Sequence, residues 1–198
     1  MALACAVLVA FSVAFIDRPV ERYVATHTAN NLFLEALASP SLLSLPFASL
    51  YLLFHTLRRL SGRPDIAHGN LLLTLSLAIA VGSLAKDELK WIIGRPWPFV
   101  WVKYGLYSLH PFSVGRSGAF GSFPSGHTTY IAAPMFVLWQ RLPRYRLLWL
   151  GIVLLVMIGL VGSGYHFVAD VIAGFFLGMA AAAGTILVGP KQESKPLF

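Results

Sequence analysis

The 198-residue sequence has a single cysteine and few charged residues. Cys5 has no partner for an internal disulfide, which excludes a small disulfide-stabilised secreted fold. Charged residues make up 12% of the chain and hydrophobic residues 57%, a balance outside that of soluble domains. No soluble basic domain carries the net charge of +7, which argues against nucleic-acid binding. The composition predicts an integral membrane protein.

Hydrophobic residues gather into six apolar runs, which predict an all-α, polytopic membrane bundle of about six transmembrane helices: 2–16, 41–57, 70–93, 127–142, 147–162 and 167–188. Several runs are shorter than the roughly 20 residues of a full span, so they must extend into loops or thin the bilayer locally. We expect one integral membrane domain over residues 1–198. Because no basic residue precedes the first run, we expect a retained helix and no cleaved signal peptide.

The basic residues outside the motifs predict the orientation in the membrane. They follow alternate runs: Arg58, Arg59, Arg63, Arg141, Arg144, Arg146, Lys191 and Lys195. The positive-inside rule makes that side cytoplasmic, although Arg18 and Arg22 fall on the other side. We therefore expect a multi-pass protein of the inner membrane, with the polar motifs described next facing the periplasm or the exterior.

Two histidines open apolar runs and carry most of the chemistry. Ser125, Gly126 and His127 lie where a helix would begin, and the free N–H groups and positive dipole end there suit an anion. His166 and Asp170 are four residues apart and would share one helix face. A carboxylate bonded to one imidazole nitrogen fixes the tautomer and leaves the other nitrogen free as base or nucleophile.

The segment before these motifs adds positive charge. Lys90 and Arg95 flank the exit of the third run, and cations stabilise a phosphoryl transition state. Residues 94–123 form a long aromatic-rich loop that also carries Lys103 and Arg116, and we expect it to roof the site. Lys86 beside Asp87 indicates no more than local ion pairing. Together these features point to a membrane-embedded enzyme that handles phosphate.

Three motifs in order resemble the type 2 phosphatidic acid phosphatase family over residues 90–174. The family's Pro-Ser-Gly-His motif is matched in full at residues 124–127, its third motif by His166 and Asp170, and the lysine of its first motif by Lys90. Two phosphate-clamping arginines of the family are absent, because Trp97 and Leu160 stand in their places. The Gly-Arg-x-Trp-Pro form resembles the branch that includes lipid A 4′-phosphatases.

The resemblance implies a metal-independent, two-step phosphoryl transfer without a cofactor. His166 would attack phosphorus, Asp170 would orient its imidazole, and His127 would protonate the leaving oxygen and then activate water. The phosphate oxygens would be held by four further residues: Lys90, Arg95, Ser125 and Gly126. Lys103 and Arg116 are further candidates to replace the missing arginines. The remaining histidines form no obvious metal-ligand set: His27, His55, His68 and His110.

The expected function is a lipid phosphatase that hydrolyses a phosphomonoester or diphosphate on a phospholipid or glycolipid headgroup, with lipid A one candidate. Two alternatives remain at this point. One is a phosphotransferase that passes phosphate from undecaprenyl diphosphate to another lipid. The other is a non-catalytic lipid-binding protein that lost two arginines, although co-located His127, His166, Asp170 and Lys90 argue against it.

Overall fold

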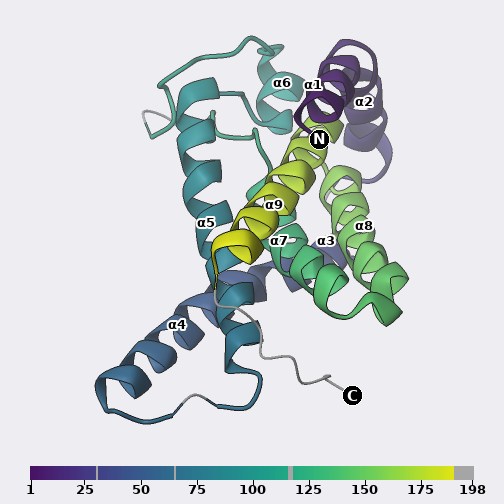
Figure 1. Cartoon of the computed structure of the whole chain (residues 1–198). Coiled ribbons are helices and arrows are strands. Elements are labelled where there is room, and N and C mark those ends of the chain that lie inside the picture. The colour runs from purple at the N-terminus through teal and green to yellow at the C-terminus, as the bar shows by residue number, and fades with distance from the viewer. Residues whose placement is uncertain (30, 65, 116–117, 190–198) are drawn as a thin grey trace.

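The computed structural model describes residues 1–29, 31–64, 66–115 and 118–189, and these form a helical bundle without strands (Figure 1). Arg116, Lys191 and Lys195 lie outside the described residues. The elements of the N-terminal half are α1 (Ala2–Phe11), the π-helix η1 (Ser12–Ile16), α2 (Asp17–His27), α3 (Leu32–Ala38), the 3-10 helix η2 (Ser39–Leu43) and α4 (Ser44–Leu60). The remainder are α5 (Gly69–Ile93), α6 (Pro98–Tyr104), α7 (Gly126–Arg141), the 3-10 helix η3 (Pro143–Tyr145), α8 (Arg146–Gly162) and α9 (Val168–Val188).

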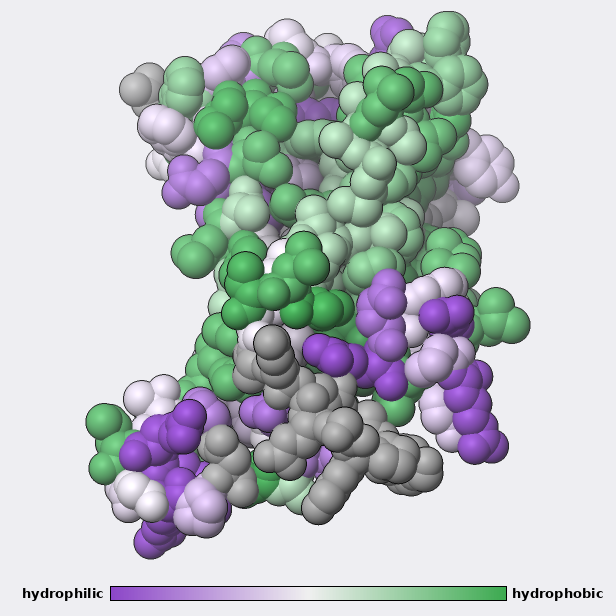
Figure 2. Space-filling view, in the orientation of Figure 1, coloured by the Kyte–Doolittle hydropathy of each residue, from purple (hydrophilic) through white to green (hydrophobic). Residues whose placement is uncertain are grey.

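The predicted all-α membrane bundle is confirmed. Five helical stretches among the described residues are long and apolar enough to cross a bilayer: Ala2–His27, Leu32–Leu60, Gly69–Ile93, Pro143–Gly162 and Val168–Val188. The predicted short spans do extend: the first continues through η1 and α2, and the second begins in α3. Figure 2 shows the result as an apolar middle between two ends at which polar residues gather.

The remaining predicted span is α7, which lies at the centre of the bundle and packs against α5, α8 and α9 (Figure 1). Its 16 residues fall short of the roughly 20 that a full span needs. Because its neighbours cover it, α7 can bury polar side chains such as Thr128 and Thr129 where a lipid-facing helix could not. Its length and polarity therefore follow from its central position.

Small residues allow α9 to approach α7 closely. A Cβ added at Gly178 would stand 2.7 Å from the Cβ of Ala132, and one added at Gly174 would stand 2.5 Å from the carbonyl oxygen of Ser125. Either addition would force the two helices apart. Tight packing here brings Ser125, which begins α7, next to Asp170, which lies in the first turn of α9.

Candidate active site

The loop between α5 and α7 folds back onto the end of α5. Gly94 ends that helix at φ 58°, and a Cβ there would lie 1.7 Å from the carbonyl oxygen of His110. The N–H of His110 donates to the Gly94 carbonyl at 2.9 Å, and the N–H groups of Gly121 and Ser122 donate to the Arg95 carbonyl at 2.9 and 3.1 Å. The fold-back places residues 95–97 beside residues 119–122, as the isolated bridge between Pro96 and Phe120 also shows. The loop roofs the site through these backbone bonds.

The helix predicted to begin at residues 125–127 does begin there. The buried Ser125 is the N-cap of α7, and its Oγ accepts a hydrogen bond from the N–H of Thr128 at 3.3 Å. The N–H of Ser125 donates to the carbonyl oxygen of Asp170 at 3.0 Å, which fixes the start of α7 against the start of α9. Gly126 and His127 occupy the first turn, where backbone N–H groups have no acceptor within the helix.

His166 and Asp170 form the predicted pair. Nδ1 of His166 lies 3.4 Å from Oδ2 of Asp170, and the same oxygen accepts the N–H of Phe167 at 3.0 Å. The hydroxyl of Ser122 also bonds to Oδ2. Both members of the pair are almost fully buried. With Nδ1 directed at the carboxylate, Nε2 of His166 is the nitrogen available for chemistry.

His166 is suited to act in its neutral form. It lies in the turn between α8 and α9, after Gly164, which adopts φ 76°. Burial lowers the pKa of His166 below its usual value, and the carboxylate of Asp170 offsets only part of that effect. A neutral imidazole at physiological pH is the form that can attack phosphorus.

Arg95 lies behind Asp170 and is enclosed by carboxylates. Its NH1 donates to Asp170 Oδ1 and its NH2 to Asp17 Oδ2, each at 2.6 Å, and NH2 also donates to the Tyr107 hydroxyl at 2.9 Å. Burial opposes the charge, but the two carboxylates outweigh it and raise the pKa of Arg95 above its usual range. Both terminal nitrogens of the predicted phosphate ligand are thus occupied, because α2 brings Asp17 to the site.

Trp97 stands at the position where the family has its first arginine. Its indole ring lies next to the imidazole ring of His166. Its ring centre is 5.1 Å from that of His166, and Nζ of Lys90 lies 5.0 Å from the ring centre of Trp97. Lys90 also donates to the carbonyl oxygen of Gly121. Lys90, the lysine of the first motif, therefore forms a cation–π pair with Trp97, and the Trp97 ring lies between it and His166 in this chain of contacts.

His127 lies beside His166, with 6.3 Å between the ring centres. Lys86 lies next to the same helix start: its Cδ and Cε are 3.4 Å from where a Cβ on Gly126 would stand. Lys86 pairs with Asp87, as its sequence position suggested, but its side chain is only 13% exposed. Sequence reasoning missed this placement, although Lys86 precedes Lys90 by four residues and therefore shares its helix face.

Lys103 and Arg116 were the accessory cations predicted from the sequence. Nζ of Lys103 lies 5.1 Å from the ring centre of Tyr104 on α6, and Arg116 lies outside the described residues. In the part of the chain that the structure describes, no group of three or more His, Cys, Asp or Glu side chains is placed to hold a metal ion. The cations described near His127 are Lys86 and Lys90 of α5.

Comparison with known proteins gives a family and two relatives. A model described as the PAP2 superfamily matches residues 70–194, more than half of the chain, and includes all three motifs. A Rhizobium johnstonii protein named Lipid A 1-phosphatase is 38% identical over 104 residues, 52% of this chain and 42% of the relative. A Rhizobium etli protein of the same name is 36% identical over 104 residues, 52% of this chain and 44% of the relative. The match thus spans less than half the length of these relatives.

Proposed function

Because the chain belongs to the PAP2 superfamily, we propose that it is a metal-independent lipid phosphatase with His166 as nucleophile. The observation that carries the proposal is the buried His166–Asp170 pair, which lies beside His127 at a helix N-terminus. The name shared by the two relatives, Lipid A 1-phosphatase, supports a lipid A phosphate as substrate. It also supports position 1 of that lipid over position 4′.

The reaction proceeds in two steps. Nε2 of His166 attacks phosphorus and forms an N–P bond while the bond from phosphorus to the leaving oxygen breaks, and protonated His127 gives that oxygen its proton. Neutral His127 then takes a proton from water, the hydroxide attacks phosphorus, and the N–P bond breaks to release inorganic phosphate. Asp170 holds the imidazole of His166 and stabilises its positive charge in the intermediate.

The phosphate lies between α5 and the start of α7. Lys90 and Lys86 supply positive charge, and Gly126 supplies a backbone N–H with the positive end of the helix dipole. The Ser125 hydroxyl adds a donor to the same oxygens. Lys86 takes the place of the missing arginines in this arrangement, and Arg95 positions Asp170 from behind without touching phosphate.

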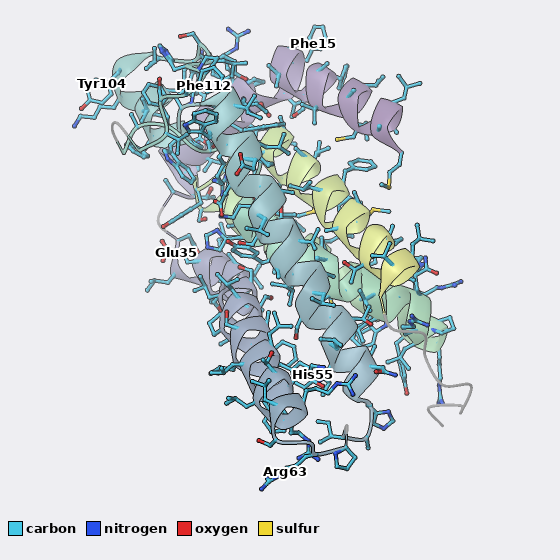
Figure 3. All side chains as sticks on the ribbon, turned by 60° about the vertical axis from the view of Figure 1, so that its left-hand side comes forward. Phe15, Glu35, His55, Arg63, Tyr104 and Phe112 are labelled. Atoms are coloured by element: carbon cyan, nitrogen blue, oxygen red, sulfur yellow. The ribbon has the colours of Figure 1, made fainter. Side chains whose placement is uncertain are left out.

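The active site faces the periplasm or the exterior from the inner membrane. Figure 3 supports this orientation, because Tyr104 and Phe112 of the roof lie at one end and Arg63 at the other. The basic side chains that follow the second span lie at that other end, which the positive-inside rule makes cytoplasmic. A lipid of the outer leaflet would then reach the site laterally.

Phosphate release by the purified protein tests the proposal. The assay contains a chelator and offers lipid A, phosphatidic acid, phosphatidylglycerophosphate or undecaprenyl diphosphate in detergent micelles. We expect release from at least one lipid, and we expect His166→Ala to reduce it to background without unfolding the protein. His55→Ala, at the far end of α4, is the matched control and should keep full activity (Figure 3). The mechanism would be refuted if the chelator inactivated the enzyme and added metal restored its activity. It would also be refuted if the His166→Ala variant were active.

A further inference from the structure

An apolar groove of about 100 Å³ lies between α7, α8 and α9, toward the end of α7 opposite His127. None of the described residues that line it is charged: Ala132, Met135, Phe136, Trp139, Trp149, Leu150, Val153, Phe175 and Met179. Ala132 and Val153 are buried and the others are partly exposed, so the groove has a closed floor and an open side. Because α8 and α9 are long and apolar enough to span a bilayer, that side opens toward lipid.

Three arginines lie where η3 joins α7 to α8, at one end of the groove: Arg141, Arg144 and Arg146. The guanidinium carbon of Arg146 is 5.6 Å from the ring centre of Trp139, which lines the groove. The guanidinium carbon of Arg144 is 5.5 Å from the ring centre of Tyr145, and that ring lies 6.0 Å from the ring of Trp149, another lining residue. Aromatic contacts thus connect two of the three cations to the groove, at an end where Figure 2 shows polar residues.

These arginines have no counter-charge in the neighbouring sequence. Residues 126–162, which include α7, η3 and α8, contain no Asp or Glu. In the part of the chain that the structure describes, none of the three arginines forms an ion pair. The one hydrogen bond that the described residues give them runs from Nε of Arg146 to the carbonyl oxygen of Trp139, at 3.5 Å. Their terminal nitrogens are therefore available to an anionic ligand, and guanidinium groups bind phosphate well.

The arginines lie at the depth of lipid headgroups. Leu147 follows Arg146 directly and is 84% exposed, and Leu148 is 54% exposed. The surface of α8 that faces lipid thus begins immediately after the last arginine. A guanidinium group at this boundary meets the phosphates of the adjacent leaflet. The chain attached to such a phosphate extends toward the membrane centre, which is the direction of the groove.

We infer that this groove binds an acyl chain of an anionic glycerophospholipid whose phosphate lies on Arg144 and Arg146. The occupant must combine an apolar chain with a negative group at one end, because the groove is apolar and the cations lie at its end. A phospholipid of the leaflet opposite the histidines meets both requirements. The bound lipid contacts α7, α8 and α9 together, stabilises their packing and takes no part in phosphoryl transfer.

Lipid retention measured by native mass spectrometry tests the headgroup contact. The purified protein is released from micelles that contain equal amounts of phosphatidylglycerol and phosphatidylethanolamine, and the wild type should retain phosphatidylglycerol. Arg144→Gln combined with Arg146→Gln should weaken this retention about tenfold or more, the range for a lost charge-assisted hydrogen bond. Arg58→Gln combined with Arg59→Gln is the matched control, because it removes the same charge at the end of α4, away from the groove (Figure 1). This control should retain lipid as the wild type does.

A second pair of variants tests the groove itself. Leu150→Trp fills the groove and leaves the arginines in place, so it should also lower the retention of phosphatidylglycerol. Leu147→Trp places the same side chain at an exposed position of α8 outside the groove lining, and it should change nothing. Thermal unfolding in detergent checks that each variant is folded, and Leu150→Phe replaces the tryptophan variant if that one is not.

Three results would overturn the inference. The first is a wild type that retains both lipids equally. The second is an equal loss of retention when the arginines of α4 are removed, which would show that net charge alone attracts the lipid. The third is a folded variant with a filled groove that retains phosphatidylglycerol as the wild type does.

Discussion

Arg95 holds two buried carboxylates at once, and this makes it a structural residue of the site. Asp17 and Asp170 come from α2 and α9, and each accepts from one terminal nitrogen of Arg95 at 2.6 Å. Asp17 also accepts the N–H of Ala169 at 2.9 Å, so the first turn of α9 is bound through both aspartates. The position of His166 therefore depends on Asp17 and Arg95, which are remote from it in sequence.

Replacement of Arg95 tests this role. Arg95→Ala leaves two buried carboxylates without a counter-charge, so it should lower the free energy of unfolding by about 3–5 kcal/mol. Lys90→Ala should change stability little but lower kcat/KM strongly, because the proposed mechanism assigns Lys90 to the phosphate. The measurements are thermal unfolding in detergent and phosphate release.

A second substitution tests whether Arg95→Ala loses stability because two charges are left unpaired or because side-chain packing is lost. Asp17→Asn combined with Arg95→Ala removes one of the two uncompensated charges, so the double variant should recover part of the lost stability. If Arg95→Ala unfolds like the wild type and loses only turnover, Arg95 contacts substrate and the buried ion pairs matter little.

The chemistry-bearing residues could be predicted where the signal is local. His166 and Asp170 were recognisable because four residues separate them, and the cap at Ser125 because it begins an apolar run. The Arg95–Asp17 pair spans 78 residues, and no periodicity within a helix indicates such a contact. Lys86 was misjudged for a related reason: its neighbour Asp87 is visible in sequence, whereas Gly126 is brought to it only by helix packing.

The long helices and the loop over residues 94–123 were predictable as elements, but the short helix within that loop was not. Residues 94–123 contain the short helix α6, which has no apolar periodicity long enough to reveal it. The second span bends where η2 joins α3 to α4, and Figure 1 shows α4 leaning away from the bundle. Helix α3 packs against α8, and residues of α3, η2 and α8 line a cavity of about 180 Å³ beside His127. Tertiary packing decided both features.

Gly94 tests whether the loop must fold back for the site to form. A Cβ at this position would overlap the carbonyl oxygen of His110, so Gly94→Ala should release the loop and abolish turnover. The measurement is limited proteolysis within residues 95–123 together with phosphate release.

Gly105 provides the matched control for this change. It adopts φ 70° with no atom within 4 Å of an added Cβ, so Gly105→Ala should cost only the about 1–2 kcal/mol of a left-handed alanine. It should keep the loop protected and the enzyme active. Equal behaviour of the two variants would show that the close approach to His110 is dispensable.

At the scale of the whole molecule, exposed apolar side chains form the surface that lipid covers. On α4 alone these include Leu50, Leu53 and Leu57, each more than half exposed. Figure 2 shows such residues around the middle of the molecule and polar residues at both ends. The composition correctly predicted that the protein lies in a lipid bilayer. Hydrophobic residues make up 57% of the chain, which is more than a core of this size can bury.

Orientation in the membrane is the last property to test, and the single cysteine makes the test direct. Tyr104 and Arg63 lie at opposite ends of the molecule, and both are exposed (Figure 3). In a Cys5→Ala background we place one cysteine at either position, as Tyr104→Cys or Arg63→Cys, and treat right-side-out vesicles with a membrane-impermeant maleimide. Because basic residues favour the cytoplasmic side, the cysteine at 104 should react at once and the one at 63 only after the vesicles are opened. The reverse pattern would place the histidines in the cytoplasm, where they would meet lipids of the inner leaflet.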